Sequence, residues 1–433
     1  MMATGQDPAS LSASAAAALL QQRSLSAEHL LEACLQRISE REPQVLAWRC
    51  LDIEAARAQA RALDAGPLRG PLHGLPLAIK DLFDTRDLPS GYGSPIYAQH
   101  RPLADAAAVA LCREAGAIVL GKTVTTEFAT FTPGPTRNPH NPQHTPGGSS
   151  SGSAAAVAAH MVPLALGTQT AASIIRPAAY CGVVGFKPSF GLIPRAGIKS
   201  LSESLDTVGG FGRSVADVAL LTSVLAGAPH WRRLQVDSAP RIGLCRTPHW
   251  QAAGAAARQA LEACAQRLAQ AGAEVVDVNL PASFNGLAEV HDQIMWAEAF
   301  KALTDERLHH SGQLSDNLRQ RLAIGERIDF VHNRYNHRQV AYARADLDNV
   351  FAHCDMLLTL SASGEAEAGL ERTGDPLFSR IWSALGLPSV HLPTTRGPAG
   401  LPLGIQLIGP CDTDAQTLGW CHWAEQQLQS QKD

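Results

Sequence analysis

The sequence of 433 residues lacks the features that mark nucleic-acid-binding and membrane proteins. Its 36 Lys and Arg residues stand against 40 Asp and Glu residues, which gives a formal net charge of −4, and no basic run occurs. Such a chain has no electrostatic footprint for nucleic acid. The apolar run at residues 15–20 is too short for a membrane span and follows Asp7 instead of a cationic segment. We therefore expect no nucleic acid, no membrane and a cytoplasmic location.

Metal-binding patterns are also missing from the sequence. The nine cysteines are scattered and form no C-x-x-C pair, which argues against a zinc ribbon and favours a reducing compartment. His309, His310, His332 and His337 lack the H-E-x-x-H spacing of zinc hydrolases. We expect these histidines to be solvated or half-buried, and we expect neither a metal nor another cofactor.

No G-x-S-x-G elbow is present around the nucleophile-like Ser173, which has Ala171 on one side and Ile175 on the other. An α/β-hydrolase is therefore disfavoured. A Ser-His-Asp triad stays open, because its members meet in space and not along the chain.

One nucleotide-binding motif is matched in sequence, but the residues around it do not predict the structure that the motif needs. Residues 116–123, G-A-I-V-L-G-K-T, match the P-loop expression. A P-loop cradles phosphate with the N–H groups of an exposed loop that leads into a helix. Here the intervening residues are Ala-Ile-Val-Leu, which predict a buried strand. A nucleotide-dependent enzyme is the weaker alternative.

Hydrophobic periodicity predicts an α/β protein without linkers or repeats, and hence a single domain over residues 1–433. Helices are predicted at residues 27–39, 104–115, 214–227, 253–270 and 414–428, with a mostly helical region at 290–351. Strands are predicted to end at Lys80 and to cover residues 117–120, 241–245, 274–278, 356–360 and 404–408. The strand–helix–strand order over residues 241–278 predicts a parallel pair.

Two stretches carry candidate chemistry. Small residues at 145–177 include Gly147 and Gly148, which let another group approach the backbone, and Ser173 follows in a second small-residue turn. Ser150, Ser151 and Ser153 are expected to cap the helix that follows them. Lys80 ends an apolar strand, and a lysine can act as a base only when burial lowers its pKa enough to make it neutral.

These stretches resemble the amidase signature family. P-G-G-S-S-S-G-S-A-A-A at 146–156 and G-T-Q-T-A-A-S-I-I-R-P-A-A at 167–179 are similar to its central blocks. G-L-P-L-A-I-K-D at 74–81 and S-L-D-T-V-G-G-F-G-R-S-V-A-D at 204–217 are similar to flanking blocks in the same order. The clear match covers about residues 74–217. The resemblance implies one large domain with a mixed central β-sheet covered by helices on both faces.

The resemblance also implies an amidohydrolase that cleaves the C–N bond of a small carboxylic amide to a carboxylate and ammonia or amine. By motif position, Ser173 is the nucleophile, Ser149 is the bridging serine after a cis peptide, and Lys80 is the base. The backbone N–H groups of Thr170, Ala171, Ala172 and Ser173 would form the oxyanion hole. The chemistry agrees, since a serine needs a base and a second hydroxyl can relay its proton.

Departures from the family pattern concern the substrate. Ala171 and Ala172 replace the Gly-Gly of most members and narrow the cleft. Arg176 stands where malonamidases have an arginine, and it would either grip a substrate carboxylate or form a structural salt bridge. Glu127 is expected to line the site. The glutamine-hydrolysing subunit of a tRNA amidotransferase, which resembles these enzymes, is the main alternative, and a homodimer is left open.

Overall fold

One mixed β-sheet organises the chain. The computed structural model describes residues 7–429, and its eleven strands run in the order β1-β3-β2-β4-β6-β5-β10-β11-β9-β7-β8. Parallel pairing joins β2 to β3 and β4, and β7 to β8 and β9, whereas the other pairs are antiparallel. The strands are β1 Trp48–Leu51, β2 Pro76–Lys80, β3 Ile118–Thr123, β4 Leu164–Gln169, β5 Val184–Lys187, β6 Thr207–Gly212, β7 Arg241–Leu244, β8 Glu274–Asp277, β9 Met356–Leu360, β10 Ser389–Arg396 and β11 Pro402–Ile408.

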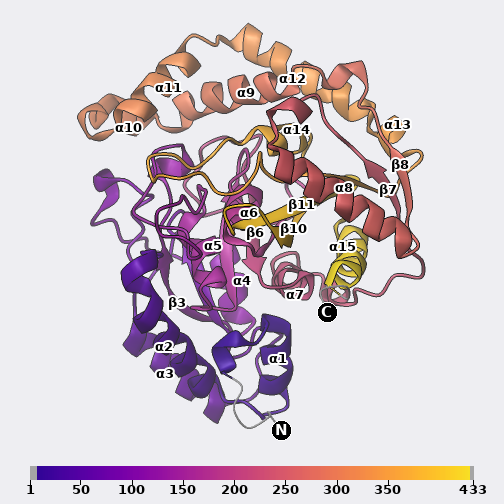
Figure 1. Ribbon diagram of the computed structural model, residues 1–433. Coiled ribbons are helices and arrows are strands. Elements are labelled where there is room, and N and C mark those ends of the chain that lie inside the picture. Colours follow the sequence, from indigo (N-terminus) through magenta and orange to yellow (C-terminus); the bar gives the residue numbers. More distant parts are fainter. Residues whose placement is uncertain (1–6, 430–433) are drawn as a thin grey trace.

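Helices surround this sheet, and the segment from α9 to α13 lies along one side of the molecule, remote from α1, α2 and α3 (Figure 1). The helices are α1 Ala13–Gln21, α2 Ala27–Val45, α3 Ile53–Ala65, α4 Ala107–Glu114, α5 Ser151–Ala158, α6 Ile175–Cys181, α7 Val215–Leu225, α8 Ala255–Gln270, α9 Leu287–Ala302, α10 Thr304–His309, α11 Asp316–Glu326, α12 Phe330–Ala345, α13 Leu347–Phe351, α14 Leu377–Leu385 and α15 Asp414–Gln429.

Helices cover both faces of the sheet. Successive residues of a strand point to opposite faces, and strand β9 shows this alternation. Met356 and Leu358 belong to the apolar cluster that contains residues of α8 and α15, whereas Leu357 belongs to the cluster with residues of α9 and α14. The expected single domain with a mixed sheet between two layers of helices is therefore confirmed.

Several predicted elements are present with shifted ends. Strand β2 ends at Lys80, and the β7–α8–β8 unit is parallel as expected. Ser214 and Asp217 form a reciprocal capping box at the start of α7. Helix α2 was predicted to end near residue 39 but continues to Val45, because the polar stretch at 39–44 hides its extension from a hydrophobic pattern.

The P-loop-like residues form part of the sheet. All six residues of β3 are buried, and Lys122 donates from its Nζ atom to the carbonyl oxygen of Phe83 (2.7 Å) and the Oγ atom of Ser90 (2.7 Å). It also pairs with Asp81 at 3.0 Å. No exposed loop remains in residues 118–123 to cradle phosphate, so the nucleotide-binding alternative is wrong.

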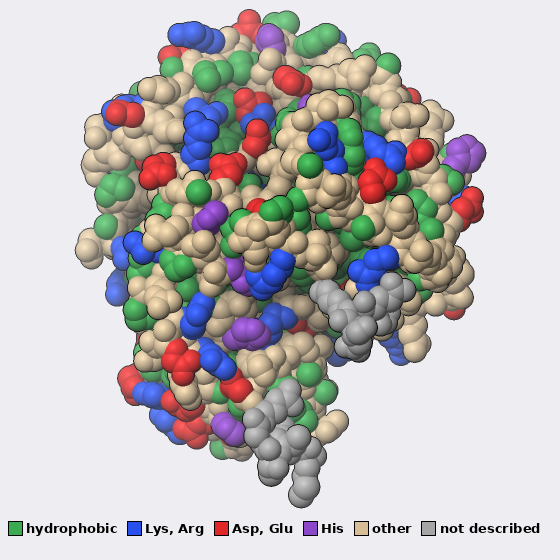
Figure 2. Space-filling view, in the orientation of Figure 1, with side chains coloured by type: hydrophobic (Ala, Val, Ile, Leu, Met, Phe, Trp, Pro, Cys, Tyr) green, Lys and Arg blue, Asp and Glu red, His purple; other side chains and the backbone are tan. Residues whose placement is uncertain are grey.

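The described part of the chain adds two findings on metals and membranes. Within residues 7–429, no cluster of three or more His, Cys, Asp or Glu side chains is suited to a metal ion. None of the helices described there is long and apolar enough to cross a bilayer. On the face shown in Figure 2, acidic and basic side chains are interspersed.

Candidate active site

Lys80 is held at the end of a central strand, next to two hydroxyl groups. Because β2 and β4 are parallel neighbours, their carboxyl ends lie side by side. The Nζ atom of Lys80 donates to the Oγ1 atom of Thr168 at 2.7 Å and to the Oγ atom of Ser149 at 2.8 Å. The side chain is completely buried. Burial lowers the pKa of Lys80 to about 7, and the negative charge of Asp206 opposes this shift.

Ser149 lies in the glycine-rich loop that precedes α5. The Gly148–Ser149 peptide bond is cis, and Gly147 adopts a left-handed conformation with φ of 79°. The carbonyl oxygen of Ser149 accepts from the hydroxyl of Thr125 at 3.2 Å and from the N–H of Thr126 at 3.3 Å. These bonds fix the backbone of Ser149 while its hydroxyl lies next to Lys80.

The three following serines do not cap α5 through their side chains, which corrects the expectation from the sequence. The hydroxyl of Ser150 donates to the carbonyl oxygen of Thr168 (3.2 Å), and that of Ser151 to the carbonyl oxygen of Val124 (3.3 Å). Ser153 donates to the carbonyl oxygen of Leu166 at 2.9 Å. These hydroxyls therefore satisfy two carbonyl groups of β4 and that of Val124, the residue after β3.

The turn at residues 170–173 leads from β4 into α6 and carries Ser173, which is 7% exposed. Each of its four carbonyl groups accepts a hydrogen bond. The donors are His291 Nε2 to Thr170 (2.9 Å), Ser383 Oγ to Ala171 (2.7 Å), Arg176 N to Ala172 (2.9 Å) and Ser150 N to Ser173 (3.3 Å). Among the residues that the structure describes, the N–H groups of Ala171, Ala172 and Ser173 donate to no partner. This region therefore has unpaired donors, as an oxyanion hole requires.

Gln169 and Ser383 hold the same turn through hydrogen bonds to its backbone and to the start of α6. The Oε1 atom of Gln169 accepts from the N–H groups of Ile174 (2.9 Å) and Ile175 (3.0 Å), at the start of α6. Its Nε2 atom donates to the Oγ atom of Ser383 at 3.0 Å. The Gln169 side chain thus holds the end of the turn, and it also holds Ser383, which donates to the carbonyl oxygen of Ala171.

Arg176 contacts backbone carbonyl groups. Its Nη2 and Nε atoms donate to the carbonyl oxygen of Gly148 at 2.7 and 3.2 Å, and its Nη1 atom donates to that of Gly374 at 2.5 Å. Burial lowers the pKa of Arg176 to about 10, so it stays charged at neutral pH. Neither interpretation from the sequence included these partners, and no salt bridge to a carboxylate forms within residues 7–429.

Glu127 is engaged at the start of a helix. Its carboxylate accepts from the N–H of Ser315 at 3.0 Å and from the hydroxyl of Ser315. Ser315 is the N-cap residue of α11. The carboxylate thus ties the loop after β3 to α11, and its expected substrate contact stays a prediction.

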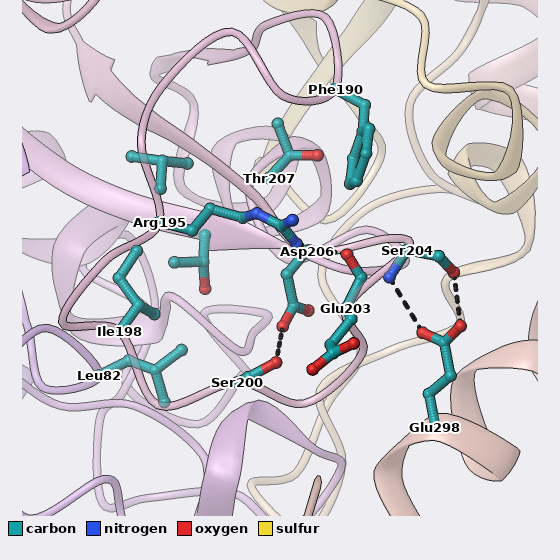
Figure 3. Close-up of a pocket in the computed structure, with 12 residues that line it drawn as sticks. Leu82, Phe190, Arg195, Ile198, Ser200, Glu203, Ser204, Asp206, Thr207 and Glu298 are labelled. Atoms are coloured by element: carbon teal, nitrogen blue, oxygen red, sulfur yellow. Dashed lines mark hydrogen bonds between the residues drawn. The ribbon is translucent and has the colours of Figure 1, made fainter.

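A cavity of about 520 Å³ adjoins the Lys80 side of the site. Thr168, which accepts from Lys80, forms part of its wall, together with Asp206, Arg195 and Glu298. Figure 3 shows the Asp206 carboxylate next to Ser200 and the Glu298 carboxylate next to Ser204 within this cavity. Ser149 and Ser173 are not among its lining residues. Among the groups that hold Lys80, Thr168 therefore contacts the cavity directly.

Asp206 connects this cavity to the turn that carries Ser173. Its carboxylate accepts from the hydroxyl of Thr170 at 2.6 Å and from the N–H groups of Leu201 (2.8 Å) and Ser202 (3.0 Å). Burial raises the pKa of Asp206. Sequence patterns alone did not single out Asp206 or Thr168, although both lie in the family blocks.

Comparison with known proteins assigns the family. The family model described as Amidase matches residues 29–418, and the chain belongs to the amidase signature family. It is 34% identical to a glutamyl-tRNA(Gln) amidotransferase subunit of Synechococcus sp. (strain WH7803), over 93% of this chain and 94% of that protein. The corresponding subunit of Synechococcus sp. (strain CC9605) is 32% identical and covers 95% of both chains.

Solved structures of the family share the fold. A crystal structure of an amidase has a TM-score of 0.87 and 32% identity, covering 96% of this chain and 99% of that one. The native peptide amidase from Stenotrophomonas maltophilia has a TM-score of 0.83 and 30% identity, covering 97% of each chain. The chain is thus similar to enzymes that act on different amides, and it is a hydrolase of C–N bonds by family.

The buried Lys80 predicts a specific dependence of stability on pH. Its pKa falls from 10.5 in the unfolded chain to about 7 in the fold, so the unfolded state binds more protons between these values. The wild type should therefore gain stability over Lys80→Met as pH rises through this window, by a slope approaching about 1.4 kcal/mol per pH unit. Urea unfolding of both proteins at pH 7, 8 and 9 measures this gap. A constant gap would show that Lys80 is charged in the fold.

Proposed function

We propose that this protein is an amidase that hydrolyses a small carboxylic amide through an acyl-enzyme, with Ser173 as nucleophile, Ser149 as relay and Lys80 as base. The observation that carries the proposal is the bond from Lys80 to the Ser149 hydroxyl at 2.8 Å, at a lysine whose pKa lies near 7. A base with a pKa near the working pH is the most effective one.

In the proposed proton path, the Ser149 hydroxyl gives up one proton and accepts another. Neutral Lys80 takes the proton of Ser149 while Ser149 takes the proton of Ser173, whose oxygen attacks the amide carbon. Within residues 7–429 the two serine hydroxyls share no hydrogen bond, and such bonds tighten when substrate binds. The loop of Ser149 and the turn of Ser173 already touch through the N–H of Ser150.

Collapse of the tetrahedral intermediate would return the proton to the leaving nitrogen. Until then, the oxyanion accepts hydrogen bonds from backbone N–H groups of the turn Thr170, Ala171, Ala172 and Ser173. Breakage of the C–N bond gives ammonia or an amine and leaves the acyl group on Ser173. Water activated by the same relay then releases the carboxylate.

The small residues of the turn favour a compact acyl group. Ala171 is 5% exposed and belongs to an apolar cluster with Leu82 and Phe128, so its methyl group fills space that a glycine would leave free. The guanidinium group of Arg176, on α6, donates two hydrogen bonds to the carbonyl oxygen of Gly148, which is a structural role. The grip on a substrate carboxylate that the sequence suggested competes with this structural role, and Arg176→Lys distinguishes the two.

A second function is favoured by the relatives. The chain is similar over nearly its whole length to subunits of glutamyl-tRNA(Gln) amidotransferases, at 32% to 34% identity. Because those relatives are named as subunits, glutamine hydrolysis with partner chains is the alternative. Ammonia release from short amides by the purified chain alone supports the free-standing amidase, whereas release from glutamine only after partner chains are added supports the alternative.

We expect a fluorophosphonate to form one adduct with the protein, at Ser173. The reason is that the unpaired N–H groups of Ala171, Ala172 and Ser173 lie in the same turn as this serine and can stabilise the phosphonyl oxygen of the adduct. Intact mass and peptide mapping measure the adduct, and Ser150→Ala is a matched control that should be labelled normally. A label on a cysteine or on another serine would refute the assignment.

Lys80→Ala and Ser149→Ala should each lower kcat by orders of magnitude, because residues that act as one relay fail together. Steady-state ammonia release measures the loss, and circular dichroism tests whether both variants are folded. Lys122→Met is the control for removing a buried lysine outside the relay. Near-normal turnover of Lys80→Ala would end the Ser-Ser-Lys mechanism and reopen a histidine base.

Arg176→Lys tests which role the arginine has. A lysine keeps the charge but cannot reach two carbonyl oxygens with a rigid fork. If Arg176 only holds Gly148 and Gly374, kcat/KM should fall equally for neutral amides and for monoamides of short dicarboxylic acids. If it also grips substrate, the loss should be at least tenfold larger for the carboxylate-bearing amides, as expected for a lost bidentate pair. We expect the equal loss, since the fork donates to backbone carbonyl groups.

A further inference from the structure

His291 and Ser383 contact the back of the turn that would form the oxyanion hole, and both lie outside the signature core at residues 74–217. His291 lies on α9 and is completely buried, and its Nε2 atom is 2.9 Å from the carbonyl oxygen of Thr170. Ser383 lies on α14, and its hydroxyl donates to the carbonyl oxygen of Ala171 at 2.7 Å. Helices α9 and α14 pack against each other and thus approach the turn together.

The protonation of His291 follows from its partner. A carbonyl oxygen only accepts hydrogen bonds, so Nε2 carries the proton and Nδ1 is left as an acceptor. Nδ1 is buried and has no partner among the described residues. Burial lowers the pKa of His291 to about 4, which keeps the ring neutral and this tautomer in place at neutral pH.

Peptide geometry transmits these two contacts to the front of the turn. The carbonyl group of one residue and the N–H of the next belong to one planar trans unit and point in opposite directions. The bond from His291 to the Thr170 carbonyl therefore sets the direction of the Ala171 N–H. In the same way, Ser383 sets the direction of the Ala172 N–H.

Thr170 is also held by its side chain. Its hydroxyl donates to Asp206 at 2.6 Å while its carbonyl accepts from His291, so the peptide plane cannot rotate without losing one of the two bonds. We propose that His291 and Ser383 are positioning residues that aim the N–H groups of Ala171 and Ala172 at the oxyanion. This inference rests on the proposed amidase function.

The expected effect is smaller than that of losing a donor. Removing one oxyanion-hole donor costs roughly a hundredfold to a thousandfold in kcat. A donor that is present but misdirected should cost about tenfold to a hundredfold, mostly in kcat, because substrate binds before the charge develops. A merely structural role would instead lower stability and leave the activity per folded molecule unchanged.

The experiment compares His291→Leu, His291→Gln and Ser383→Ala with the wild type. The amide N–H of glutamine can replace the Nε2 donor, whereas leucine cannot. We measure the rate constant for fluorophosphonate labelling of Ser173, kcat and KM for a short amide, and the melting temperature. His391→Leu is the control, since His391 is an equally buried histidine whose Nδ1 atom bonds Ser361 at 2.6 Å.

We expect His291→Leu and Ser383→Ala to slow both labelling and kcat about tenfold to a hundredfold with KM nearly unchanged, and His291→Gln to recover most of the loss. Normal rates in both His291→Leu and Ser383→Ala would overturn the positioning role and leave the proposed amidase function standing. Equal losses in His291→Gln and His291→Leu would overturn the role of the donated bond. If His291→Leu does not fold, Ser383→Ala and His291→Gln decide. A wild type without label at Ser173 would overturn the proposed function and this inference with it.

Discussion

The desolvation of Lys80 is the constraint on which the rest of the site depends. Burial lowers the pKa of a lysine whatever its role, and Lys122 is buried to the same extent on the neighbouring strand β3. The two differ in their partners, because Lys122 pairs with the Asp81 carboxylate at 3.0 Å whereas Lys80 is held by the hydroxyls of Ser149 and Thr168. A hydroxyl partner leaves the neutral form accessible, and a carboxylate partner favours the charged form. In the proposed mechanism, this difference in partners makes Lys80 the base, whereas Lys122 forms an ion pair with Asp81.

The second constraint is the direction of the peptide groups between Thr170 and Ser173. Every carbonyl of this turn has a donor behind it, and two of these donors come from helices far away in the sequence. The signature core thus contains the proposed reacting groups, while α9 and α14 contribute the donors that contact the carbonyl groups of Thr170 and Ala171. Because preorganised donors need no rearrangement as charge develops, this rigidity is worth more in a buried site than in water.

The sequence predicted the proximity of Lys80 and Ser149 better than it predicted the residues around them. Lys80 could be placed because an apolar strand leads directly into it, and the family blocks place Ser149 next to it, as the structure does. Strand β6 escaped prediction because T-V-G-G-F-G contains three glycines and has little of the β-branched and aromatic pattern of a strand. His291 escaped prediction because its contact with Thr170 joins residues 121 positions apart and has no periodic signal.

Arg176 shows why the partners of a buried charged residue are hard to predict from the sequence. The sequence offered two carboxylate partners, one in the substrate and one in the protein, because unpaired buried charges are costly. The fold offers backbone carbonyl groups instead, which every residue has and which no sequence pattern reports. By binding the carbonyl oxygen of Gly148 from the first turn of α6, Arg176 links the helix that follows Ser173 to the loop that carries Ser149. One side chain thereby bridges the two segments whose serines the proposed mechanism uses, and a proton transfer between two hydroxyls requires such segments to be held in place.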